Sequence, residues 1–190
     1  MREARHHTLY KKANTAGRGR PDFSLLTEIV PQAVQDAMHV ASARLSKAGV
    51  RHALIGGLAV GVHGYPRTTR DVDLLVGDEA FEIHPSGVVT LNSAVPIAVG
   101  TVAVDPVSVG LEEAYLEREL SSVQGRVPVV GLPALVYLKL RVGRAKDKAD
   151  VVGLLAAGAN QDAILAYLQK HDPELLDRFA WCVQTAESEE

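Results

Sequence analysis

The sequence predicts an α/β fold with a helical part toward its C-terminal end. Two short apolar runs, residues 53–55 and 72–76, have the character of strands, and the stretch between them begins with two glycines and continues as a helix. The alternating run 101–105 adds a further strand. From residue 133 onward, apolar side chains recur at helical spacing instead. With 190 residues, 47% of them hydrophobic, the chain is long enough to bury the core of one domain, or of a domain with a helical appendage.

A helix is expected before the first strand and another directly after it. Gly49 closes the first helix, and residues 58–62 form the second, which opens from the pair Gly56 and Gly57. Five apolar residues place one buried face on the first helix: Val34, Ala37, Met38, Ala41 and Leu45. In the second strand, three apolar residues form the inward face: Val72, Leu74 and Val76.

Two carboxylates alternate along the second strand. Asp71 and Asp73 are two residues apart, so their side chains are expected to point the same way. Adjacent carboxylates repel each other and raise one pKa unless a cation lies between them. Magnesium binds such oxygen ligands together with substrate phosphates, which makes the pair a candidate anchor for a metal-bound nucleoside triphosphate. The alternative is a pair of solvated carboxylates at a strand end.

The glycine pair fits the same chemistry. Without side chains, Gly56 and Gly57 let backbone N–H groups approach a phosphate at the start of a helix, where the dipole favours an anion. The alternative is a tight turn from strand to helix and nothing more.

These motifs resemble the signature of the nucleotidyltransferase superfamily with the DNA polymerase β type palm, in which a Gly-Gly or Gly-Ser pair precedes Asp-x-Asp. The added Arg67-x-Thr69-x-Asp71 is most similar to the branch of AbiEii-type toxins and small antibiotic nucleotidyltransferases. Residues 138–151 resemble the run of lysine, arginine and aspartate that follows the palm in that branch. The resemblance implies a palm with a mixed sheet flanked by helices over residues 21–130, with the helical part 131–190 packed on it.

The activity implied by the resemblance is transfer of an NMP from an NTP to a hydroxyl acceptor, with release of pyrophosphate. Asp71 and Asp73 would hold Mg²⁺ or Mn²⁺. Palms of this type use a third carboxylate from a later strand, for which Asp105 is the candidate, and it would also assist deprotonation of the acceptor. Pro106 is expected to stop the ladder bonding directly after it. The alternative for Asp105 is a residue that initiates a turn before proline.

The resemblance also suggests contacts to the nucleotide. It places Arg67 beside the metal site, and Arg67 and Thr69 join the glycines as candidate ligands of the nucleotide. The alternative for Arg67 is a surface charge. The alternative for Thr69 is a local bond to the backbone. Lys139 is the first candidate for a triphosphate contact and Lys146 the second. The alternative for both lysines is a solvated helix face.

The helix that carries Lys139 is expected to run from Pro133 to about Val142. It would bury Leu135, Leu138 and Val142, while Lys139 and Arg141 project elsewhere. We expect Asp150 to pair with Lys146, one helical turn before it. Further helices are expected at residues 149–157, 161–169 and 174–185.

Two segments depart from the family pattern or lie outside it. Family members place an amphipathic helix between the Asp-x-Asp motif and the third carboxylate, but residues 77–100 favour extra strands or a hairpin. Residues 1–20 are basic and predict a disordered arm, or a flexible arm that touches RNA phosphates. Because the whole chain carries a net charge of −3, the remainder after this basic segment is acidic, which argues against a broad nucleic-acid surface.

The composition limits which disulfide, metal and membrane features we expect. The single Cys182 excludes an internal disulfide, and the scattered histidines do not suggest zinc. No apolar run approaches membrane-spanning length and no signal-peptide core is present, which predicts a cytoplasmic protein without a membrane partner.

The acceptor stays open at the level of sequence. A tRNA end, a small hydroxyl compound and a protein side chain are the alternatives. A hypothesis from another class is a non-catalytic nucleotide-binding or partner-binding module with a degenerate palm, such as a toxin–antitoxin component with an antitoxin-type protein partner.

Overall fold

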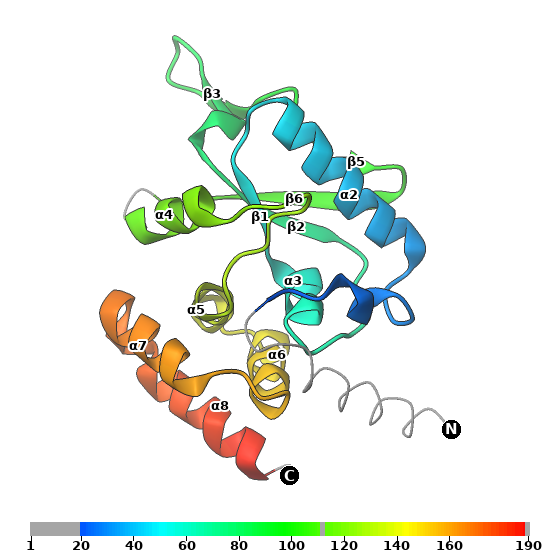
Figure 1. Ribbon diagram of the computed structural model, residues 1–190. Helices are drawn as coiled ribbons and strands as arrows, with labels where there is room; N and C mark the ends of the chain where they lie inside the picture. Colours follow the sequence, from blue (N-terminus) through cyan, green and yellow to red (C-terminus); the bar gives the residue numbers. More distant parts are fainter. Residues whose placement is uncertain (1–19, 111–112, 189–190) are drawn as a thin grey trace. The chain divides into compact units, whose positions relative to one another are not determined.

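The computed structural model describes residues 20–110 and 113–188 (Figure 1). The predicted basic arm lies outside the described residues except for Arg20. The chain divides into two units. Val30–Leu58 and Thr68–Val130 form the sheet unit, and the described residues up to Ile29, Ala59–Arg67 and the chain from Gly131 form the helical unit. The division of the chain predicted from sequence, at residues 21–130 and 131–190, stays a prediction.

A mixed sheet organises the sheet unit. Its order is β1 (His52–Leu54), β2 (Val72–Val76), β6 (Val102–Ser108) and β5 (Ala98–Val99). β2 pairs antiparallel with β1 and parallel with β6, and β5 pairs antiparallel with β6. This sheet and the helices that accompany it confirm the predicted α/β fold class.

The core of the sheet unit follows the predicted apolar pattern. α2 (Gln32–Lys47) packs against the strands and buries all five residues predicted for its inner face. The predicted inward residues of β2 are fully buried, and β6 alternates buried Val102 and Val104 with exposed Ala103 and Asp105. Alternation leaves the opposite face of β6 for polar side chains.

Pro106 does not end its strand, so the predicted stop is wrong. β6 continues to Ser108, and Pro106 is the register partner of Leu74 in β2. N–H groups alternate sides along a strand, and Val104 donates to Ile97 O on the β5 side. The nitrogen of Pro106 faces that same side, beyond the residues of β6 that pair with β5. A missing N–H at this position therefore removes no ladder hydrogen bond.

A hairpin occupies the segment between the Asp-x-Asp motif and Asp105. After a short 3₁₀ turn, η2 (Asp78–Ala80), strands β3 (Phe81–Ile83) and β4 (Val89–Leu91) pair antiparallel. The prediction of extra strands or a hairpin in residues 77–100 is therefore confirmed. α4 (Ala114–Ser122) follows β6.

Helices make up the described helical unit. The unit contains η1 (Phe23–Leu26), α5 (Leu132–Val142), α6 (Ala145–Ala156), α7 (Gln161–His171), η3 (Pro173–Leu175) and α8 (Leu176–Ser188). α5 packs against α6 and α7, and α6 packs against α8. In Figure 1 these four helices run from yellow-green to red. The helices predicted after residue 133 are confirmed, with α6 beginning four residues earlier than expected at Ala145.

α3 (Gly56–Val62) leads the chain from the sheet unit into the helical unit. It includes both glycines rather than starting after them. Within the described ranges, no helix combines the length and the apolar character that a membrane span requires.

Candidate metal centre

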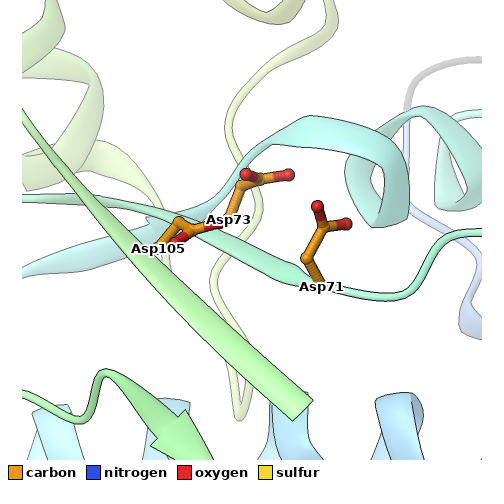
Figure 2. A group of neighbouring side chains, drawn as sticks. All are labelled: Asp71, Asp73 and Asp105. Atoms are coloured by element: carbon orange, nitrogen blue, oxygen red, sulfur yellow. The ribbon is translucent and has the colours of Figure 1, made fainter.

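The sheet brings the three predicted aspartates together (Figure 2). Asp73 in β2 is the register partner of Asp105 in the parallel strand β6, and Asp71 lies directly before β2. Figure 2 shows Asp105 directed toward Asp73 from the neighbouring strand. One carboxylate oxygen from each residue lies within 4.8 Å of the others. Among the described residues, this is the cluster of acidic, histidine and cysteine side chains that is close enough to hold a metal ion.

The donor set suits a hard divalent cation. Asp71 and Asp73 are half-buried and Asp105 is exposed, so three negative groups converge at the edge of solvent. At such separations like charges repel, and a cation between them removes the repulsion. Mg²⁺ and Mn²⁺ prefer carboxylate oxygens, whereas zinc prefers histidine and cysteine. The side chains therefore fit the metal that the sequence predicts.

Gly56 makes room for the Asp73 carboxylate. Its φ is +65°, in the left-handed region that favours glycine, and a Cβ at this position would overlap the carboxylate of Asp73. The backbone also joins the two residues, because Ile55 N donates to Asp73 O at 3.0 Å. The start of α3 thus lies against a proposed metal ligand, and Gly57 follows within the same first turn.

Thr69 contacts the site through Asp71. Its hydroxyl lies 2.7 Å from Asp71 Oδ1, and the threonine is 3% exposed. The sequence suggested a nucleotide contact for Thr69, with a local bond to the backbone as the alternative. In the structure its hydroxyl bonds to the carboxylate of a proposed metal ligand. The motif spacing Thr-x-Asp is the signal that points to this bond.

Arg67 and Lys139 lie in the helical unit, where both contact Asp150. Asp150 is 1% exposed and accepts from Arg67 Nε and, at 2.7 Å, from Arg67 Nη2. Lys139 Nζ lies 2.8 Å from Asp150 Oδ2 and 3.3 Å from Asp147 Oδ1. These side chains form a buried ion-pair cluster that joins the segment after α3 to α5 and α6.

Asp147 extends the cluster to the surface. Arg144 Nε donates to Asp147 Oδ2 at 2.7 Å, and the Arg144 side chain is 72% exposed. Burial works against the charge of Asp147, but Arg144 and Lys139 outweigh it and lower the pKa of this carboxyl. Asp147 is therefore held in its ionised form.

Three expectations for this region are wrong. Lys139 is buried rather than projecting away, and Val142, predicted to be buried, is 60% exposed. Asp150 pairs with Arg67 and Lys139 instead of Lys146, which is exposed. Lys139 is buried because it pairs with two carboxylates of α6, Asp147 and Asp150. The buried face of α5 therefore includes a lysine and differs from the face that apolar residues alone predict.

The comparisons with known proteins add a fold-level similarity. No family model and no curated protein matches the chain. Among solved structures, the chain is similar to an antigenic nucleotidyltransferase-like protein from Paracoccidioides brasiliensis. The sequence identity is 17% and the TM-score 0.40, with 80% of this chain and 94% of that chain covered.

Proposed function

We propose that the chain is a metal-dependent nucleotidyltransferase that moves an NMP from an NTP to a hydroxyl acceptor and releases pyrophosphate. The single observation that carries the proposal is the convergence of Asp71, Asp73 and Asp105, whose oxygens lie within 4.8 Å of one another. The sequence points to the same three residues, Asp71 and Asp73 through the Asp-x-Asp motif and Asp105 through the resemblance to palms with a third carboxylate. Asp71, Asp73 and Asp105 are the proposed ligands of Mg²⁺ or Mn²⁺.

The proposed reaction is an in-line displacement. The acceptor oxygen forms a bond to the α-phosphorus while the bond from that phosphorus to the bridging oxygen of the β-phosphate breaks, and pyrophosphate leaves. Asp71, Asp73 and Asp105 would hold a divalent cation, which would supply charge neutralisation for the triphosphate and for the attacking and leaving oxygens. Asp105, the most exposed of the three, accepts the proton of the acceptor hydroxyl.

The proposed nucleotide contacts extend beyond the metal ligands. The turn at Gly56 and Gly57 offers backbone N–H groups at a helix start to the triphosphate. Arg67, Thr69, Lys139 and Lys146 complete the set suggested by the sequence. Among the lysines, Lys146 has the exposed side chain, whereas Lys139 is held by Asp147 and Asp150.

The proposed acceptor is a tRNA end, a small hydroxyl compound or a protein side chain. An RNA acceptor predicts loss of activity when the basic arm or the cluster from Lys139 to Lys148 is neutralised. A small acceptor predicts indifference to the arm and sensitivity in the hairpin segment, residues 77–100.

A partner-binding module without catalysis is the second candidate. The observation that favours it is the β3–β4 hairpin, because Ile83 is 79% exposed and Val89 57% exposed on the same face of paired strands. Pro106, which the sequence predicted to stop the ladder bonding, does not interrupt β6. An antitoxin-type protein is one partner that this hypothesis allows.

Transfer of label from α-³²P NTPs separates the two candidates. Wild-type protein is incubated with each NTP, Mg²⁺ or Mn²⁺, and pools of tRNA, small hydroxyl compounds and protein, and pyrophosphate release is followed in parallel. The enzyme predicts metal-dependent label transfer that Asp73→Asn abolishes. Asp36→Asn, which changes an exposed aspartate of α2 in the same unit, outside the cluster and outside residues 77–100, is expected to retain transfer. Transfer that survives Asp73→Asn would contradict the proposed role of this residue.

A further inference from the structure

We infer that Thr69 is a positioning residue for Asp71, which acts on the proposed metal site without contacting metal or nucleotide itself. The inference rests on the proposed function, since it concerns the same three aspartates. It departs from the role suggested by the sequence, in which Thr69 is a ligand of the nucleotide.

The hydrogen bond between the two side chains has a defined direction. An ionised carboxylate only accepts hydrogen bonds, so the Thr69 hydroxyl is the donor and Asp71 Oδ1 the acceptor, 2.7 Å apart. A bond of this length to a charged acceptor is stronger than one between neutral groups. The threonine is 3% exposed and β-branched, so its side chain has little freedom to turn away.

The backbone of Asp71 lies outside the strand ladder that holds the other two aspartates. Asp73 and Asp105 are register partners inside β2 and β6, so the ladder fixes their backbones. Asp73 also lies against Gly56. Asp71 precedes the first residue of β2, where that ladder does not reach. The hydroxyl of Thr69, in the segment before β2, holds the side chain of Asp71 by its hydrogen bond.

The expected consequence is a change in metal affinity. Hydrogen-bond partners of metal-ligating groups typically contribute about 10–100-fold in affinity, because they hold the ligand in its binding orientation. Thr69→Val keeps the shape of the side chain and removes the donor. Thr69→Ser removes the methyl group and keeps the donor.

The test is a Mn²⁺ titration followed by the EPR signal of the free ion, with Mg²⁺ as competitor. We expect Thr69→Val to bind Mn²⁺ about 10–100-fold more weakly than wild type, and Thr69→Ser to restore an affinity close to wild type. Thr90→Val is the matched control, because it removes a hydroxyl that bonds to His84 in the separate β3–β4 sheet and should leave Mn²⁺ affinity unchanged.

Wild type and Asp73→Asn distinguish failure of this inference from failure of the proposed function. If wild type binds Mn²⁺, Asp73→Asn does not, and Thr69→Val matches wild type, the positioning role is overturned while the metal site stands. If wild type and Asp73→Asn bind equally weakly, the metal site is wrong and the positioning role falls with it. A purely structural role for Thr69 would lower metal-free stability in Thr69→Ser and leave Mn²⁺ affinity unchanged in Thr69→Val.

Discussion

Gly56 is the residue whose backbone conformation bears most directly on the site. We expect Gly56→Ala to lose stability and Mn²⁺ binding together, because its Cβ would displace the Asp73 carboxylate. Gly100→Ala is the matched control: its φ is +59° and no heavy atom lies within 4 Å of an added Cβ. Left-handed strain alone costs about 1–2 kcal/mol.

Urea unfolding without metal and Mn²⁺ titration measure the two effects. Gly100→Ala should lose only the strain energy and bind Mn²⁺ as wild type does, whereas Gly56→Ala should lose more on both measures. Equal behaviour of the two variants would show that the contact with Asp73 has no consequence.

His52 predicts a pH dependence of stability at the residue scale. Nδ1 lies 2.9 Å from Val50 O and so donates, which leaves Nε2 to accept from the Ser42 hydroxyl at 2.8 Å in the neutral ring. Burial lowers the pKa of His52 below its ordinary value of 6.5. The unfolded chain therefore binds the proton more readily, and the contribution of His52 to stability is lost as pH falls below that value.

Unfolding free energies at about pH 7.5 and about pH 5.5 check this sign. The decrease in stability on acidification should be smaller in His52→Gln, which removes the titrating ring, than in wild type. An identical decrease in both proteins would exclude a contribution from His52.

The sequence identified the aspartates but not what holds them. Asp71 and Asp73 follow from motif spacing and strand alternation, which are local properties of the chain, and Asp105 follows from the resemblance to palms that use a third carboxylate. The burial of Lys139 depends on Asp147 and Asp150 in the next helix. A pattern of apolar residues carries no information on such pairing, so the side-chain partners could not be predicted.

At the scale of elements, Asp150 joins the segment after α3 to α5 and α6. Removal of one partner from a buried ion pair leaves uncompensated charge and costs about 3–5 kcal/mol. We expect Asp150→Ala to lose stability in this range, because Arg67 and Lys139 both depend on it. Urea unfolding of the full chain measures the loss.

Arg144→Ala is the control for the same cluster. Its side chain is 72% exposed, and Lys139 remains as a partner of Asp147 when Arg144 is truncated, so we expect Arg144→Ala to lose less stability than Asp150→Ala. A loss for Asp150→Ala no larger than that for Arg144→Ala would contradict the view that the buried cluster stabilises the helical unit.

The elements themselves were largely predictable. Turn residues and short β-rich runs in residues 77–100 predicted the hairpin, and apolar periodicity predicted α2 and the helices of the helical unit. The prediction for Pro106 was wrong because the loss of a ladder hydrogen bond at a proline depends on which side of β6 its nitrogen faces. That side is set by the register with β5, which a single sequence does not reveal.

At the scale of the whole molecule, the proposed site residues divide between the two units. The three aspartates, both glycines and Thr69 lie in the sheet unit, whereas Arg67, Lys139 and Lys146 lie in the helical unit. Mn²⁺ titration therefore tests the residues of the sheet unit, and nucleotide binding tests the full proposed set.

The most direct test of the central claim is thermal stability with ATP, CTP, GTP and UTP, each with and without Mg²⁺ or Mn²⁺, for wild type and Asp73→Asn. A ligand at about 100 times its dissociation constant stabilises the folded state by about 2.7 kcal/mol, which gives a visible shift in melting temperature. We expect a metal-dependent shift with at least one nucleotide in wild type and its loss in Asp73→Asn. The absence of a shift with every metal–nucleotide combination would contradict the assignment of Asp71, Asp73 and Asp105 as a site for a metal-bound nucleoside triphosphate.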